Sequence, residues 1–168
     1  MIARHLRHVR CIRRHLRRHW ISYGALTVVY ALLHQHYRLA LNAGHSLPGH
    51  VYLIELGQRP ARAGDLVAFR WQAHAFYRPG RLFVKVLGGL PGQRITVSNR
   101  LIAIDGRALA RAKPATRRGL PLQVIAEGVV PCGRYYVHGP HPDSLDSRYA
   151  VTGLIGEEQI IGRAHVLF

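Results

Sequence analysis

The stretch Ile95-Thr-Val-Ser-Asn-Arg-Leu-Ile-Ala-Ile-Asp-Gly106 decides the fold class, because two short apolar runs flank a pair of polar turn residues. Val and Ile favour strands, and an Asn-containing turn between two such runs favours a tight hairpin. A second turn signal, Asp105-Gly106, follows the second run. The stretch therefore predicts an antiparallel β-hairpin around Ser98 and Asn99.

The same texture continues from Val51 to the end of the chain, where short apolar runs alternate with Gly, Pro and Asn. Such runs are typical of strands separated by turns, and no segment after Asn42 has a helical period. Residues 108–121 are rich in Arg, Pro and Gly and predict a basic loop. The sequence predicts a mainly β domain with strands at Val51–Leu56, Asp65–Arg70, Leu82–Leu87, Arg94–Val97, Leu101–Ile104, Leu122–Ile125, Arg134–Val137 and Ile160–Val166.

Length and charge narrow the classes of function. The 168 residues fit one domain of catalytic size with a short appendage. The chain has 24 Lys and Arg against 8 Asp and Glu, a formal net charge of +16, which favours nucleic acid or an acidic membrane surface as a neighbour. We expect no cofactor or metal, because the two cysteines cannot form a zinc site and the histidine pairs lack strong ligand spacing (His34 with His36, His45 with His50, His138 with His141).

The N-terminal region predicts a membrane anchor. Residues 1–19 hold seven arginines and no acidic residue, and the uncharged run Trp20–Leu33 follows directly. A bilayer needs about 20 helical residues, so the run must extend through Leu41, where Arg38 can reach the headgroups. The positive-inside rule places the arginines in the cytoplasm. We therefore expect a basic cytoplasmic tail at 1–19, a transmembrane anchor at 20–41 and a periplasmic β-rich domain at 42–168.

Two other interpretations of this region stay open. A cleaved signal peptide has a similar basic start and apolar run, although no convincing Ala-x-Ala site follows here. The apolar run also has the length of a buried core helix behind a nucleic-acid-binding arm.

Lys85 and Ser46 are the candidate reactive residues. In the strand Leu82–Leu87 every neighbour of Lys85 is apolar, and burial would lower the pKa of the amine and make it a usable base. A neutral lysine beside a serine can accept the hydroxyl proton. Taken alone, Lys85 also fits an edge strand that reaches water, and Ser46 fits an ordinary turn.

The joint order of the motifs resembles the type I signal peptidases. These motifs are Ser46-Leu-Pro48, Gly64-Asp-Leu-Val-Ala-Phe69, Lys85-Val-Leu-Gly-Gly-Leu-Pro-Gly92 and Ser144-Leu-Asp-Ser-Arg-Tyr149. The match is closest to the TraF-type conjugative-transfer peptidases that mature pilin subunits, because Asn42, Ser46, Pro48 and Tyr52 fit the signature of that branch. The resemblance spans roughly residues 20–168 in the right order, which makes it more specific than any single motif.

The resemblance implies a role for each site residue. Ser46 would be the nucleophile and Lys85 the general base. Ser144 would hydrogen-bond the lysine amine, and Asp146 with Arg148 would form an ion pair behind it. Gly44 stands where the family has a threonine that donates to the oxyanion, so backbone donors such as the Ser46 amide would serve instead.

The resemblance also implies a function. It predicts a serine endopeptidase of the bacterial inner membrane, with one transmembrane helix before a signal-peptidase-like β domain. Its partners would be membrane lipid and an exported precursor such as a conjugative propilin, which it would cut or also close into a ring. No nucleic acid is expected as a partner. The alternatives are a general type I signal peptidase for secreted proteins and a non-enzymatic basic protein that binds nucleic acid.

Overall fold

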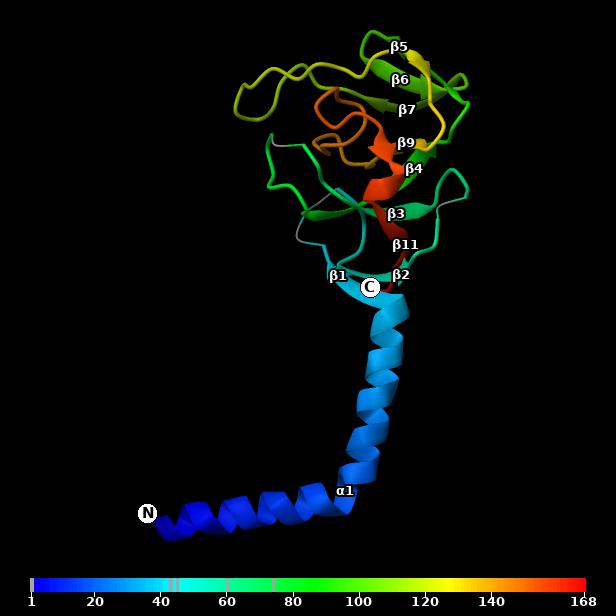
Figure 1. Cartoon of the computed structure of the whole chain (residues 1–168). Helices are drawn as coiled ribbons and strands as arrows, with labels where there is room; N and C mark the ends of the chain where they lie inside the picture. Colours follow the sequence, from blue (N-terminus) through cyan, green and yellow to red (C-terminus); the bar gives the residue numbers. More distant parts are fainter. Residues whose placement is uncertain (1, 43, 45, 60, 74) are drawn as a thin grey trace. The chain divides into compact units, whose positions relative to one another are not determined.

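The computed structural model describes residues 2–42, 44, 46–59, 61–73 and 75–168, with side chains from Ile12 onward (Figure 1). The chain divides into two compact units, Met1–His36 and Tyr37–Phe168. The first unit is one long helix and the second holds all the strands. The mainly β class predicted from the sequence is confirmed for the second unit.

The helix α1 spans Ile2–His36 and departs from helical geometry at His19, where φ is −114° and ψ is 15°. This irregular residue lies where the arginine-rich residues give way to the uncharged run. No helix among the described residues combines the length and the apolar character needed to cross a membrane. The helix also ends before Leu41, where the sequence placed the end of an anchor.

The segment Tyr37–Leu41 is strand β1, not the last turns of a helix. It pairs antiparallel with β2 over its whole length, from Tyr37 opposite Glu55 to Leu41 opposite Val51. Tyr37, Leu39 and Leu41 alternate with Arg38 and Ala40, as suits a pleated strand, and pairing with β2 satisfies the backbone groups that a helix would otherwise bond. The helix therefore ends at His36, five residues before the expected end of the anchor at Leu41.

The larger sheet has seven strands in the order β1-β2-β11-β3-β4-β9-β10, and every neighbouring pair is antiparallel. The C-terminal strand β11 lies between β2 and β3. The strands of this sheet other than β1 are β2 (Val51–Leu56), β3 (Leu66–Arg70), β4 (Leu82–Gly89), β9 (Arg134–His138), β10 (Ile155–Gly156) and β11 (Ile160–Val166).

The smaller sheet has the order β7-β6-β5-β8 and contains the predicted hairpin. Its strands are β5 (Arg94–Ser98), β6 (Leu101–Ile104), β7 (Arg107–Arg111) and β8 (Gly128–Val129). Asn99 and Arg100 have positive φ angles of 45° and 60°, as a two-residue hairpin turn requires. Part of the expected loop 108–121 is strand β7, because it extends the hairpin by pairing with β6. The expected strand at residues 122–125 is reduced to a single bridge between Val124 and Tyr149.

Strand β4 packs in the core and carries the candidate residue Lys85. Leu87 and the partly buried Phe83 pack in one apolar cluster with Val67 and Phe69, whereas Val84 and Val86 pack in another. Lys85 shares the face of Phe83 and Leu87 by strand alternation and is only 2% exposed. The strand therefore holds an amine inside the protein between apolar side chains.

Candidate active site

Ser46 lies in the loop between β1 and β2, and Asn42 closes this loop through its side chain. The Asn42 Nδ2 group donates hydrogen bonds to the carbonyls of Leu47 (3.1 Å) and Gly49 (3.0 Å), and Oδ1 accepts one from the Gly44 amide (3.0 Å). Asparagine suits such a loop because its amide imitates a backbone turn. The backbone on both sides of Ser46 is thereby fixed by one residue.

The C-terminal half of the same loop rests on the larger sheet. Tyr52 on β2 is 1% exposed, and its hydroxyl donates a hydrogen bond to the Pro48 carbonyl. Gly49 has a φ of +93°, and a Cβ added there would lie 2.7 Å from Val166 on β11. The larger sheet therefore supports this half of the loop through β2 and β11, and only glycine fits at position 49.

The loop geometry predicts that Asn42 positions Ser46, and Asn42→Asp tests this. Aspartate keeps the size and shape but loses both N–H donors, so a carboxylate would face the carbonyls of Leu47 and Gly49. We expect kcat to fall about 10- to 100-fold with a smaller change in KM, because small misplacements of a reacting group are costly. Steady-state kinetics on a cleavable peptide measure this, and an unchanged kcat would show that Asn42 does not position Ser46.

Lys85 meets Ser144 inside the protein. The Lys85 amine donates a hydrogen bond of 2.7 Å to the Ser144 hydroxyl, which lies 59 residues further along the chain. Burial lowers the pKa of Lys85 from 10.5 to about 8, the Asp146 charge opposes this, and the Arg148 charge adds to it. A hydroxyl partner orients the amine without charging it, so a useful fraction of the lysine is neutral near pH 8.

Asp146 and Arg148 form a buried ion pair behind Ser144. The Arg148 guanidinium donates through Nε to Asp146 Oδ1 and through Nη2 to Oδ2, both at 2.8 Å. The side chains are 0% and 3% exposed. The pair also holds Gly139 from both sides, since Asp146 accepts a hydrogen bond from the Gly139 amide and Arg148 donates one to the Gly139 carbonyl. This pairing keeps the Asp146 carboxylate away from direct contact with the lysine.

Gly139 lies against both Ser46 and Ser144, which the sequence did not predict. A Cβ added there would lie 2.4 Å from the Ser144 hydroxyl oxygen and 2.9 Å from the Ser46 carbonyl oxygen. The absence of a side chain lets the loops that carry Ser46 and Ser144 approach each other. Its only sequence signal is the dipeptide Gly139-Pro140, which indicates no more than a turn.

We predict that Gly139→Ala separates these two loops. The added methyl group has backbone on one side and the Ser144 side chain on the other, so Ser144 must leave the lysine amine. The expected result is a loss of kcat of about 100-fold and a destabilisation of about 1–3 kcal/mol from overpacking. Gly24→Ala in helix α1 is the control for stability, because Gly24 has no positive φ and the structure has no atom within 4 Å of a Cβ there. Wild-type kinetics for Gly139→Ala would contradict this account.

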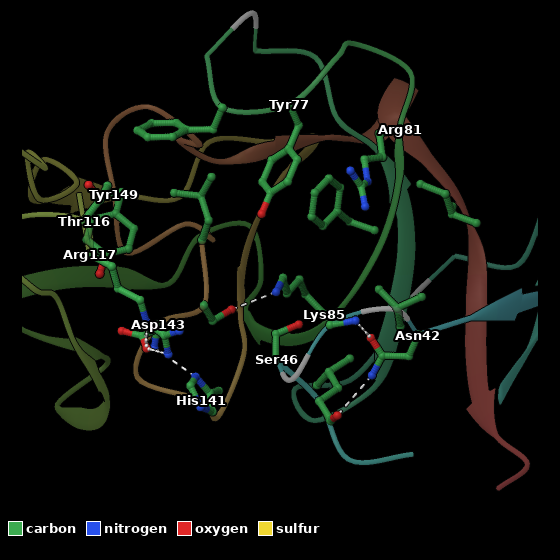
Figure 2. A pocket seen from close by; sticks show the side chains of 18 of the residues that line it. Asn42, Ser46, Tyr77, Arg81, Lys85, Thr116, Arg117, His141, Asp143 and Tyr149 are labelled. Atoms are coloured by element: carbon green, nitrogen blue, oxygen red, sulfur yellow. Dashed lines mark hydrogen bonds and ion pairs between the residues drawn. The ribbon is translucent and has the colours of Figure 1, made fainter. Parts of the chain in front are cut away.

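Ser46, Lys85 and Ser144 line one cleft of about 710 Å³, whereas Asp146 and Arg148 lie behind its wall. Figure 2 shows the Ser46 hydroxyl and the Lys85 amine in the same part of this cleft, with the amine bonded to a serine hydroxyl. The lining combines apolar residues of β1 and β4, namely Ala40, Leu41, Leu82, Phe83 and Val84, with the ionisable residues Arg81, Lys113, Arg117, His141 and Asp143. The structure thus brings together the three residues expected to meet.

The described part of the chain contains no group of three or more His, Cys, Asp and Glu residues placed to hold a metal ion. Of the histidine pairs considered from the sequence, His45 lies outside the described residues. Burial lowers the pKa of His138 on β9 below 6.5, and the charge of nearby Lys85 lowers it further. The imidazole is therefore neutral in the pH range in which Lys85 titrates.

Comparison with known proteins gives consistent matches. The sequence model described as "Signal peptidase, peptidase S26" matches residues 12–168. The conjugal transfer protein TraF of Agrobacterium fabrum is 28% identical over 145 residues, covering 76% of this chain and 81% of that protein. Signal peptidase I U of Bacillus subtilis is 34% identical over 98 residues, covering 54% and 52%, and signal peptidase I of Bacillus amyloliquefaciens is 28% identical over 148 residues, covering 83% and 68%.

Proposed function

This chain belongs to the peptidase S26 family of signal peptidases, which are serine peptidases, and on that premise we propose that Ser46 and Lys85 are its catalytic dyad. The observation that carries the proposal is the buried Lys85 amine, bonded to Ser144 at the floor of the cleft that Ser46 lines. Ser144 orients the amine, and Asp146 with Arg148 holds the Ser144 loop.

The dyad accounts for peptide cleavage by acyl transfer. Neutral Lys85 accepts the Ser46 hydroxyl proton as the oxygen attacks the substrate carbonyl carbon. The Ser46 amide donates to the oxyanion, since Gly44 has no side chain for this and its own amide donates to Asn42. The lysine then gives its proton to the departing amine as the C–N bond breaks. Water releases the acyl group as a free acid, whereas an attacking amine of the substrate would close a ring.

The substrate segment on one side of the cut lies along β4 in this proposal. Among the described residues β9 pairs with β4 only from Val86 to Gly89, so Leu82–Lys85 keeps one unpaired edge. This part of β4 lines the cleft next to Ser46. An extended peptide can add to such an edge as a further strand, with its side chains alternately facing the apolar wall. Binding in this way would bring the carbonyl of the peptide bond to be cut close to Ser46.

We propose an exported propilin as the substrate, because the TraF relative spans most of both chains. The test is co-expression with a panel of candidate precursors that includes a propilin and a general secretory precursor, comparing wild type with Lys85→Ala. Lys85-dependent maturation of the propilin alone supports the proposal. Maturation of the secretory precursor supports a general signal peptidase, and equal maturation by both variants overturns the dyad. The product mass separates a linear cut from a ring, which is lighter by one water molecule.

We also propose that helix α1 attaches the peptidase to the cytoplasmic membrane. The support is the seven-arginine segment followed by the uncharged run Trp20–Leu33. Extraction of membranes tests it: an embedded protein stays in the membrane in 1 M salt and needs detergent, whereas release by salt alone would show purely electrostatic binding.

The pKa of Lys85 predicts how the rate depends on pH. Only the neutral amine accepts a proton, and burial lowers the pKa of Lys85 to about 8. Below this pH, kcat/KM is expected to fall about tenfold per pH unit, and above it to level off. Stopped assays between pH 6 and 9.5 measure the profile. A rate that is flat from pH 6 to 8 would contradict a lysine base.

A further inference from the structure

We propose that a charged part of the cleft lining selects substrates with an acidic side chain. This side chain would lie in the segment beyond the cut, where the peptide leaves the edge of β4. The inference rests on the proposed peptidase function and adds a specificity to it. Its basis is a cluster of Lys113, Arg117 and Asp143, which we call the basic wall.

The basic wall joins two loops on the side of Ser46 away from β4. Lys113 and Arg117 belong to the loop that follows β7, and Asp143 directly precedes Ser144. Arg117 donates to Asp143 Oδ2 through Nε (2.9 Å) and through Nη2, and Lys113 pairs with Oδ1. Figure 2 shows Arg117 and Asp143 on the opposite side of Ser46 from Arg81. A peptide bound at Ser46 therefore meets this wall after it leaves β4.

The loop that carries the two cations is fixed rather than free. Arg100 on the β5–β6 turn donates hydrogen bonds to the carbonyls of Ala112 (3.0 Å), Lys113 (2.5 Å) and Leu122 (2.7 Å). The Lys113 amide donates to the buried Tyr149 hydroxyl. The loop is thus anchored at both ends, which places its cations in the cleft before substrate binds.

The charge balance of the cleft leaves a positive surplus. Apart from Lys85, which is neutral when it acts as the base, the described lining residues Arg81, Lys113 and Arg117 are basic, and Asp143 is the only acid among them. The hydrogen bonds from Lys113 and Arg117 lower the pKa of Asp143 to about 2, so this carboxylate stays ionised and neutralises one of its two partners. Arg117 has five N–H donors and uses two on Asp143, and its side chain is 80% exposed. It can therefore bind a second carboxylate without giving up the first.

The expected size of the preference for an acidic side chain follows from the exposure of Arg117. Ion pairs of exposed side chains are weak, so we expect Asp or Glu to be favoured over Gln by about 2- to 5-fold and Lys to be disfavoured by a similar factor. The preference should shrink in 1 M salt, where the screening length is about 3 Å.

The experiment uses the full-length protein in detergent and a library of short peptides that are randomised at every position. Sequencing of the products by mass spectrometry gives the enrichment at each position. The variants are Arg117→Gln, Arg117→Glu and the matched control Arg118→Gln, which removes an equal charge from a neighbouring exposed residue outside the cleft. Lys85→Ala defines which products depend on the dyad.

Four results are decisive. Enrichment of Asp and Glu on one side of the cut, lost in Arg117→Gln, reversed in Arg117→Glu and kept in Arg118→Gln, is the expected one. Absence of acidic enrichment in wild type overturns the inference alone. Enrichment that is equal in Arg117→Gln shows that the wall is only structural and also overturns it. Absence of any Lys85-dependent product overturns the proposed function, and the inference falls with it.

Discussion

Lys85→Met is expected to abolish peptide cleavage while it raises the free energy of unfolding at pH 7. Methionine cannot accept the Ser46 proton, so kcat should fall by about 10³-fold or more. The stability gain arises because burial lowers the pKa of Lys85 from 10.5 to about 8. Each pKa unit of this difference means that the charged amine destabilises the folded state by about 1.4 kcal/mol. Methionine fills a similar volume without a charge.

The net gain is smaller than the full cost of the buried amine. The cost is about 3 kcal/mol from that shift, and removing the amine leaves the Ser144 hydroxyl without its partner, which costs about 1–2 kcal/mol. We therefore expect Lys85→Met to be more stable by about 1–2 kcal/mol at pH 7. The folded state binds fewer protons than the unfolded state between pH 8 and 10.5, so the stability of the wild type rises over that range and the advantage of the variant disappears.

Urea unfolding at pH 7 and pH 10 measures this dependence, together with a cleavage assay. Lys85→Arg serves as the control for charge, because a guanidinium in the same place stays protonated and cannot act as a base. A variant that is less stable than wild type at pH 7 would show that the amine is stabilising in its buried place. A Lys85→Arg variant that keeps activity would show that the base is another group.

Asp146→Asn is expected to have the largest effect on stability. It leaves the Arg148 guanidinium, 3% exposed, without the carboxylate that accepts its Nε and Nη2 hydrogen bonds. Breaking a buried pair from one side typically costs about 3–5 kcal/mol, because an uncompensated charge remains inside. The Gly139 amide also loses its strong acceptor, so the loops of Ser46 and Ser144 lose their support.

Thermal and urea unfolding measure the loss, and a second variant separates charge from shape. Asp146→Asn combined with Arg148→Met removes both charges, and we expect it to recover more than half of the stability lost in the single variant. Cleavage should stay low in both, since Gly139 is no longer held. Equal stability of Asp146→Asn and wild type would contradict the role given to the pair.

Strand β4 could be predicted from the sequence because the pattern of a strand depends on residues close together in the chain. Alternation placed Lys85 on the face of Phe83 and Leu87, and both predicted hairpin strands around Asn99 are present. The resemblance in motif order also named Ser46, Lys85 and Ser144, which line the cleft. The strand and turn patterns depend on neighbours within a few residues, which a single sequence displays.

Other features depend on partners far along the chain. Residues 37–41 follow a long helix and look like its continuation, and only the pairing with β2 makes them a strand. The closeness of Gly139 to Ser46 and Ser144 arises where two loops meet across 93 residues of sequence. The link from Lys113 and Arg117 to Asp143 is of the same kind, since the basic loop shows its charges but not the acid that holds them.

The most direct test of the dyad is to locate the acyl group on the enzyme. The full-length protein is mixed at pH 8 with an activated ester of a short alanine peptide, quenched in acid and digested, and the fragments are analysed by tandem mass spectrometry. This account predicts an acyl ester on Ser46 that is absent in Ser46→Ala and forms far more slowly in Lys85→Ala. An acyl group on Ser144 or another side chain, or its equally fast formation on Ser46 without Lys85, would contradict it.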